Sequence, residues 1–205
     1  MQKEKKHVVT ALVITLSLCF LGIFSGCATS GRTDLAGESN AVSTNPEGRT
    51  YYTKVNIWYE DPSRIFSTNY HKGNIIPVGT QVKIRSFRMD QIQFTDESEA
   101  TVYTLIYMSK YSQVTMKELF DQYFSEGNVM AEGGEFTKFT KEEQDNIKMG
   151  TIAEGMCREA VLMAYGYPPK HRTPSLSNNM WTYWNNRFDT VVITFQDDRV
   201  QNIKN

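Results

Sequence analysis

The pattern of apolar and polar positions divides the chain into three parts. Residues 8–24 are almost all apolar or small and follow a basic start that contains Lys3, Lys5 and Lys6. Residues 28–50 are rich in Ser, Thr, Gly and Asn, with no aromatic residue and no apolar period, which is typical of a flexible segment. Aromatic and β-branched residues begin at Tyr51. The pattern therefore predicts a leader (1–26), a flexible tether (27–50) and folded sequence from residue 51 onward.

Between residues 51 and 110 the apolar positions alternate with polar ones, which is the period of a β-strand. Asp61-Pro62-Ser63 and the acidic stretch 96–99 have the composition of turns. Several short strands separated by regularly spaced turns are typical of a small barrel. The strands expected here are residues 51–59, 65–70, 79–87, 91–94 and 101–108.

Residues 111–150 are predicted to be helical. Thr115 with Glu118, and Thr140 with Glu143, have the spacing of capping boxes at helix N-termini. After the first box, apolar residues recur with the helical period from Met116 to Phe124 and form a stripe. We expect this stripe to pack on a free face of the C-terminal sheet, with residues 127–135 as the junction between two modules.

The last part of the chain predicts one helix followed by three strands. The helix covers residues 155–165, and Gly166 and Pro168 end it because glycine suits a left-handed cap and proline cannot continue a helix. The strands expected are residues 181–184, 190–195 and 200–203. The predicted fold class is thus α+β: a small β-barrel (51–110), a helical connector (111–150) and an α+β module with a three-stranded antiparallel sheet (151–205).

Composition narrows the range of functions. The formal net charge of the chain is −1, so it offers no general electrostatic reason to bind nucleic acid. The chain has three cysteines, and Cys19 belongs to the predicted leader. If Cys27 is modified as described next, only Cys157 stays free, and no internal disulfide can form.

The end of the leader resembles the lipobox of bacterial lipoproteins. Phe24-Ser25-Gly26-Cys27 closes the apolar run, although leucine is usual where Phe24 stands. The resemblance implies cleavage between Gly26 and Cys27, acylation of Cys27 and attachment to a membrane through several acyl chains. Ala28 differs from the aspartate typical of lipoproteins kept at the inner membrane, which implies the outer membrane. An uncleaved helical anchor is the alternative, because the run is close to the shortest length that spans a bilayer.

Two further resemblances concern the folded part. Val55-Asn56-Ile57-Trp58 followed by residues 76–84 resembles bacterial SH3-like domains. Gly155-Met156, Gly166-Tyr167-Pro168 and Trp181-Thr182-Tyr183 resemble the small lipoprotein subunit of the outer-membrane β-barrel assembly machinery, the SmpA/OmlA type. Cys157 and Ala160 depart from that motif, which places a hydroxyl at the helix N-cap and an acidic or amide residue three positions later.

Cys157 is the one candidate nucleophile in the folded part, since a helix N-terminus lowers the pKa of a thiol. A cysteine hydrolase also needs a histidine base within reach. His71 lies in the predicted barrel and His171 in a Pro-flanked loop, so neither has the expected position. We predict no enzyme, no cofactor and no metal site, with a cysteine hydrolase as the rejected alternative and Cys157 as a substitute cap residue.

Aromatic residues on the first C-terminal strand are the candidate partner surface. Trp181 and Tyr183 point to one face of the strand and Trp184 to the other, and Arg187 follows in the turn. Either the sheet is covered on both faces, or one aromatic face is exposed and marks a partner site. The sequence thus predicts a non-catalytic lipoprotein that binds envelope or outer-membrane proteins from the periplasmic side; the alternative is binding of peptidoglycan through the SH3-like module.

Overall fold

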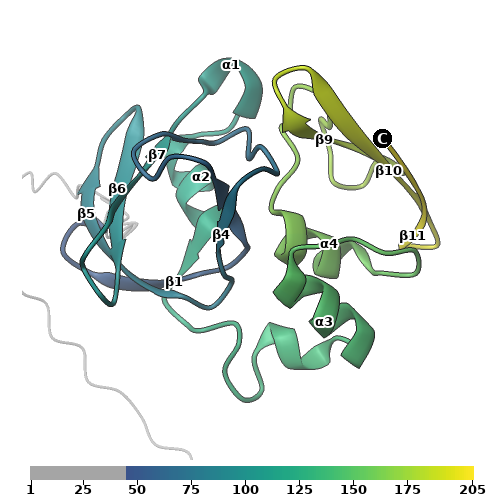
Figure 1. Cartoon of the computed structure of the whole chain (residues 1–205), viewed down its shortest axis with the longest axis horizontal. Helices are drawn as coiled ribbons and strands as arrows, with labels where there is room; N and C mark the ends of the chain where they lie inside the picture. Colours follow the sequence, from purple (N-terminus) through teal and green to yellow (C-terminus); the bar gives the residue numbers. More distant parts are fainter. Residues whose placement is uncertain (1–44) are drawn as a thin grey trace, which may run out of the picture. The chain divides into compact units, whose positions relative to one another are not determined.

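Strands with alternating apolar and polar residues in the first half of the chain form a curled six-stranded sheet. The computed structural model describes residues 45–205, which belong to a single compact unit (Figure 1). The predicted leader and nearly all of the predicted tether, including Cys27, therefore lie outside the described residues. The strands of this sheet are β1 (Thr50–Thr53), β3 (Ile65–Phe66), β5 (Gln81–Phe87), β6 (Gln91–Asp96), β7 (Val102–Ile106) and β8 (Phe124–Ser125).

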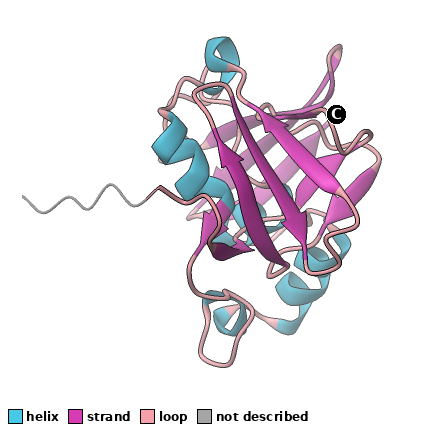
Figure 2. Cartoon of the chain, turned by 90° about the vertical axis from the view of Figure 1, so that its left-hand side faces the viewer, coloured by secondary structure: helices cyan, strands magenta, loops and turns pink. Residues whose placement is uncertain are grey.

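The strand order in this sheet is β3-β7-β6-β5-β1-β8. All pairs are antiparallel except β3 with β7, which are parallel. The sheet curls around helix α2 (Met116–Tyr123), and Figure 2 shows its strands crossing in front of helices. Short α1 (Ser109–Ser112) connects β7 to α2.

The apolar stripe of α2 lies inside this curled sheet. Leu119, Phe120 and Tyr123 are buried with Tyr51 and Phe94 in the first hydrophobic core. The expectation that the stripe packs on the C-terminal sheet was therefore wrong. The concave face of a curled sheet leaves an apolar space that a helix fills, and α2 follows the sheet directly in the chain.

Two predicted strands are shorter than expected because polar side chains interrupt them. The stretch 51–59 breaks at residues 54–56 into β1 and β2 (Ile57–Tyr59), and β2 pairs with β4 (Asn74–Ile76) in a separate two-stranded sheet. The stretch 65–70 is a strand only at β3, after which Ser67 and Asn69 are buried and make side-chain hydrogen bonds. Asn69 also has a positive φ of 51°, which is incompatible with a strand.

The second half contains a three-stranded antiparallel sheet and two helices, as predicted. After the 3₁₀ turn η1 (Glu135–Lys138), helices α3 (Lys141–Met149) and α4 (Arg158–Tyr165) follow. The sheet order is β11-β10-β9. Its strands are β9 (Met180–Asn186), β10 (Asp189–Gln196) and β11 (Arg199–Lys204).

The local signals at the ends of these elements are largely confirmed. Both capping boxes, Thr115 with Glu118 and Thr140 with Glu143, are formed. Asp197 and Asp198 have φ values of 51° and 59°, the signature of a tight two-residue hairpin turn. Gly166 has φ 76° but ψ −169°, so it ends α4 in an extended positive-φ conformation and not in the left-handed cap that we expected.

The two halves share contacts that cross the middle of the chain. The second core contains Val78 from the first half, packed with residues of α3, α4 and the three-stranded sheet. The predicted connector 111–150 divides between the two cores, since α2 contributes to the first and Ile147 of α3 to the second. The fold is therefore mixed α+β, with two cores inside one compact unit.

Candidate functional site

Cys157 is the N-cap residue of α4, as the sequence predicts, and its thiol makes no capping hydrogen bond. Partial burial, together with the nearby carboxylate of Glu143, raises the pKa of the Cys157 thiol to about 11. The thiol is therefore protonated near neutral pH, the opposite of what a nucleophilic cysteine requires.

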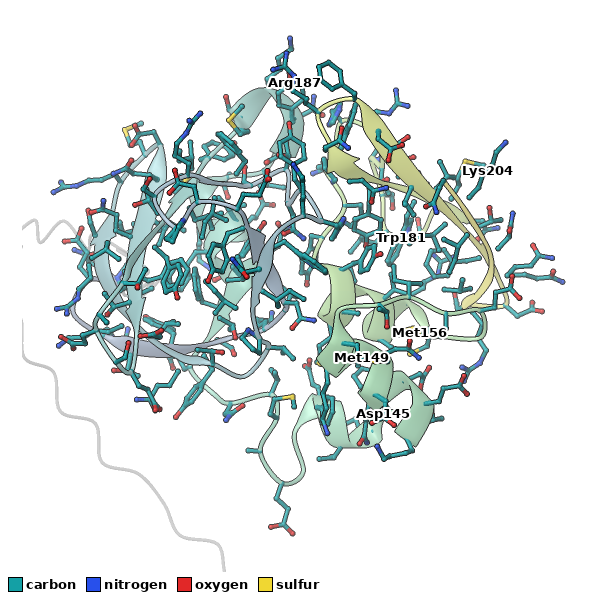
Figure 3. All side chains as sticks on the ribbon, viewed as in Figure 1. Asp145, Met149, Met156, Trp181, Arg187 and Lys204 are labelled. Atoms are coloured by element: carbon teal, nitrogen blue, oxygen red, sulfur yellow. The ribbon has the colours of Figure 1, made fainter. Side chains whose placement is uncertain are left out.

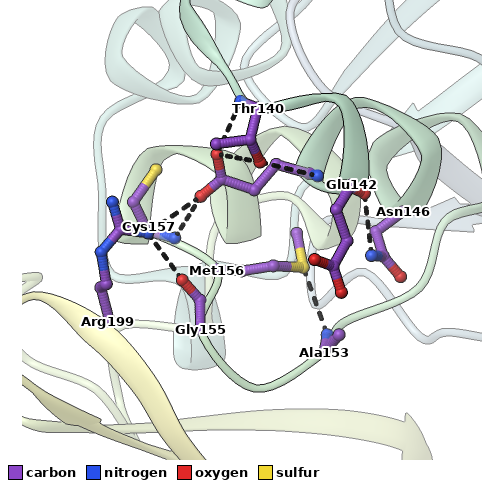
Figure 4. Close-up of polar contacts among 9 residues, drawn as sticks. Thr140, Glu142, Asn146, Ala153, Gly155, Met156, Cys157 and Arg199 are labelled. Atoms are coloured by element: carbon purple, nitrogen blue, oxygen red, sulfur yellow. Dashed lines mark hydrogen bonds and ion pairs between the residues drawn. The ribbon is translucent and has the colours of Figure 1, made fainter.

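Glu143 supplies the cap that Cys157 lacks. Its side chain is only 8% exposed, and one carboxylate oxygen accepts the backbone N–H of Cys157 at 2.9 Å. The other oxygen accepts the N–H and hydroxyl of Thr140, both at 3.0 Å, in the capping box of α3. One carboxylate thus caps two helices, and Figure 4 shows these bonds together with Arg199 of β11, whose guanidinium lies 3.4 Å from the same oxygen that binds Cys157.

Burial opposes the ionisation of Glu143, but the hydrogen bonds from Cys157 and Thr140 outweigh it and hold its pKa below the ordinary value. The sequence showed the box with Thr140 and gave no sign of the second cap. The partner amide lies 14 residues further along the chain, outside any local motif.

The two histidines of the described part are held by aromatic rings and backbone carbonyls. His71 stacks on Tyr165 with ring centroids 4.0 Å apart, and its Nε2 lies 2.8 Å from the Tyr165 carbonyl oxygen. Burial lowers the pKa of His71 to about 4, against smaller opposing effects of its hydrogen bonds. His171 stacks on Trp184, and its Nδ1 lies 3.1 Å from the carbonyl oxygen of Tyr111. Neither ring is a hydrogen-bond partner of the Cys157 thiol in this structure.

The candidate partner residues divide between core and surface. Trp181 and Tyr183 are completely buried between the sheet and the helices, so an exposed site cannot include them (Figure 3). Helices α4 and α3 cover this face, and the expected packing of α2 on a free face of the sheet does not occur. Trp184 points to the other face, is half-buried and stacks on His171. Arg187 is exposed at the tip of the β9–β10 hairpin.

Arg158 is a structural residue that the sequence analysis missed. Its guanidinium binds Asp198 at 2.7 Å and the carbonyl oxygens of Leu176 and Asn178 at 2.9 and 2.8 Å. It also lies over the ring of Phe195 at 4.4 Å. Arg158 therefore fastens the loop before β9 to α4 and the sheet.

A groove with a volume of about 400 Å³ lies between α2 and the loop that follows α4. Tyr123, Tyr167 and prolines of that loop form its apolar lining, and Lys54 and Glu118 bring charges of both signs. Both charged groups already have partners. Lys54 donates to the carbonyl oxygen of Asp121 at 2.8 Å, and the Glu118 carboxylate accepts the N–H of Thr115 at 2.7 Å in its capping box.

A second, smaller hollow of about 250 Å³ lies beside β2 and β3 and is lined by aromatic rings. We call it the aromatic pocket. Its rim carries both acidic and basic side chains, with Lys72 and Glu60 paired at 2.7 Å. The lining residues are Trp58, Tyr59, Glu60, Asp61, Arg64, Ile65, Phe66, Tyr70 and Lys72.

Searches of the described residues and of known proteins add little. Within residues 45–205, no group of His, Cys, Asp and Glu side chains has a metal-binding arrangement, and no helix has the length and apolar character to cross a membrane. A scan against protein-family models, a search of curated proteins and a search of solved structures each found no match. The resemblances drawn from sequence motifs therefore stay predictions.

Proposed function

We propose that this chain is a lipid-anchored envelope protein that acts by binding and has no catalytic activity. The observation that carries the anchor is Ser25-Gly26-Cys27 at the end of an apolar run behind a basic start. The acyl chains on Cys27 hold the protein at the outer membrane, where Ala28 favours export, and the folded body faces the periplasm.

Replacement of the acylated thiol tests the anchor. In the host, Cys27→Ser should abolish incorporation of labelled palmitate and leave an uncut precursor. Cys19→Ser is the matched control, because Cys19 lies inside the predicted leader and not at the predicted cleavage site. This variant should be labelled and processed normally. Labelled, mature-sized Cys27→Ser protein would contradict the proposal.

The proposed role is scaffolding of outer-membrane proteins or their assembly. It rests on the C-terminal motif resemblance, and the α4 helix against a three-stranded sheet supports it at the level of element order. The high pKa of the Cys157 thiol argues against the hydrolase alternative. Capture of membrane-anchored protein under mild detergent should recover β-barrel assembly subunits; recovery of sacculus fragments instead would favour the second candidate.

The second candidate is binding of peptidoglycan through an SH3-like module, which we propose for the curled sheet. The aromatic pocket favours it, because aromatic faces with flanking charges suit a short peptide that carries both ammonium and carboxylate groups. Tyr70→Ser should reduce retention on isolated sacculi, whereas Phe188→Ser, which removes an exposed ring outside the pocket, should not. Equal retention of both variants would exclude the pocket as the binding site.

A further inference from the structure

The β5–β6 and β9–β10 hairpins each carry a large, exposed apolar side chain at the tip. Met89 is 90% exposed and Phe188 is 82% exposed. A cation precedes each of them in the chain, Arg88 before Met89 and Arg187 before Phe188. A single exposed apolar side chain is ordinary on a protein surface, whereas apolar side chains that gather at one end beside cations can mark an interaction site.

A series of contacts places both tips at one end of the molecule. The carbonyl oxygen of Asp90, next to Met89, accepts the N–H of Tyr107, two residues before α1, at 2.8 Å. The carbonyl oxygen of Tyr111 in α1 accepts the N–H of His171 at 3.1 Å. The His171 ring stacks on Trp184, close to the turn that holds Phe188. Figure 1 shows α1 and the adjacent end of the three-stranded sheet side by side at the top of the view.

The chain enters the folded body beside the first of these tips. The carboxylate of Glu47 accepts the N–H of Phe87, the last residue of β5, at 2.7 Å. The N–H of Gly48 donates to the carbonyl oxygen of Ile84 at 2.8 Å. Asn45, the first described residue, follows Cys27 by 18 residues in the sequence. The first described residues are therefore bonded to the end of β5 that leads into the Met89 tip.

The backbone of the β9–β10 tip is tied by hydrogen bonds from its own side chains. The side-chain oxygen of Asn186 accepts the N–H of Phe188 at 2.9 Å, and Asn185 donates to Asp189 at 3.0 Å. The guanidinium of Arg187 lies 4.6 Å from the centre of the Phe188 ring. Because the backbone that carries the ring is tied by these bonds, little backbone entropy is lost when the tip binds.

Four cations lie on the segments that meet at this end. The cations are Arg88, Lys110, Arg172 and Arg187, and none of them forms an ion pair with another described residue. The carboxylates are Glu47, Asp90 and Asp189; Glu47 already accepts the Phe87 amide and Asp189 the Asn185 amide. Unpaired cations beside exposed apolar side chains fit the headgroup region of a membrane, which is apolar beneath and anionic at the surface.

We propose that this end docks on the surface of the membrane that carries the anchor. Met89 and Phe188 enter the headgroup region, and the four cations contact anionic phospholipid. The docking orients the body, so that the three-stranded sheet and the groove beside α2 have a fixed direction relative to the membrane. This inference rests on the proposed lipid anchor for its biological setting, although the docking surface itself can be tested without acyl chains.

The test uses the mature chain with Cys27→Ser, which has no leader and no lipid, and sedimentation with vesicles. Vesicles of equal parts phosphatidylglycerol and phosphatidylcholine should retain it, and pure phosphatidylcholine should retain less. The double variant Met89→Ser, Phe188→Ser should weaken binding by roughly a hundredfold, from the lost transfer of two apolar side chains. Met149→Ser is the matched control, because Met149 is 60% exposed on α3, and it should bind as the parent does.

Binding of the double variant that equals that of Met149→Ser would overturn the proposal, as would a parent chain that no vesicle retains. Recovery of a protein bound at Phe188 in place of lipid would also overturn it and assign this end to a protein partner. Melting temperatures of all variants should match, since the replaced side chains are exposed. Failure of Cys27 acylation in the host would remove the anchor but leave the vesicle result unaffected, so the two outcomes are separable.

Discussion

At the scale of single residues, the clearest departure from what local motifs predict is Glu143. A carboxylate that is nearly fully buried is stable only when its hydrogen bonds compensate for lost hydration. Here it accepts three hydrogen bonds from Thr140 and Cys157 and lies near Arg199. The thiol at the N-cap of α4 is thereby tolerated, because a residue of another helix provides the acceptor.

Glu143→Ala should destabilise the protein by about 2–4 kcal/mol, because two helix N-termini and Arg199 lose one shared acceptor. Glu143→Gln, which keeps one acceptor oxygen, should cost less. Urea unfolding monitored by circular dichroism measures both. Glu142→Gln, an exposed neighbour on the same helix, is the control and should be nearly neutral.

The Glu143 carboxylate makes a contribution to folding stability that depends on pH. Its pKa is lowered by folding, so the contribution is fully present above the pKa of the unfolded chain, about 4.3, and is lost as the pH falls through the lower folded value. The stability difference between the parent and Glu143→Gln should therefore shrink as the pH is reduced below about 4. A difference that stays constant between neutral and acid pH would contradict this role.

At this scale the sequence predicted which side chains share a face of a strand, but not which face is buried. It correctly predicted that Trp181 and Tyr183 share one face of a strand and that Trp184 lies on the other. Which face is covered depends on where α3 and α4 lie in space, and no pattern within β9 contains that information. The same limit applies to Arg158, whose partners lie 18 to 40 residues away.

At the scale of elements, the break between β1 and β2 places Asn56 where its side chain bonds to two helices, which the alternating sequence pattern did not indicate. Asn56 is 1% exposed, and its side-chain amide donates to the carbonyl oxygens of Ile147 at 2.7 Å and Ala164 at 3.1 Å. These carbonyls belong to the last turns of α3 and α4; that of Ile147 also accepts the N–H of Gly150 at 3.1 Å, whereas Asn56 is the donor to that of Ala164. The Asn56 oxygen in turn accepts the N–H of Val78 at 2.9 Å. A polar residue at an alternating position looked like a surface residue of a strand and is instead the cap of two distant helices.

Asn56→Ala should cost about 2–4 kcal/mol, since it leaves the Ala164 carbonyl and the Val78 amide buried without partners and removes one of the two donors to the Ile147 carbonyl. Asn56→Asp should be at least as damaging, because a carboxylate cannot donate to the two carbonyls. Thermal and urea unfolding measure both changes. Asn202→Ala, at an exposed position of β11, is the control, and a cost for Asn56→Ala no larger than for this control would show that water replaces the lost bonds.

The elements that the sequence predicted well are those specified by neighbouring residues. Both capping boxes and all three C-terminal strands are confirmed, because each depends on side chains within a few positions of one another. The stretch 65–70 was predicted less well. Its residues are apolar enough for a strand, but Ser67 and Asn69 are bonded to α1 and to the end of α4, elements that come much later in the chain.

At the scale of the whole molecule, polar contacts couple the two cores. His71 donates its backbone N–H to the carbonyl oxygen of Trp184 in β9 at 3.1 Å, and Asn56 joins β2 to both helices of the second half. Val78 completes the second core from the first half. The sequence predicted the order of the elements, with strands before the helices and the C-terminal sheet. The contacts that join the two halves depend on single residues, and composition does not indicate which residues these are.

This coupling predicts that damage to the first core spreads to the second. Leu119 is 1% exposed in the core of the curled sheet, so Leu119→Asp buries a charge at a cost of several kcal/mol. Leu119 does not contact the three-stranded sheet as we first expected. The amides of β10 should still lose hydrogen-exchange protection together with those of β5 and β6. The reason is that the ends of α3 and α4, which pack on that sheet, lose the hydrogen bonds of Asn56 when the first core unfolds. Lys117→Asp, exposed on the same helix, should leave both sheets protected. Continued protection of β10 while β5 and β6 exchange freely would show that the second core is stable alone, and that the contacts of Asn56 and His71 join two independent folding units.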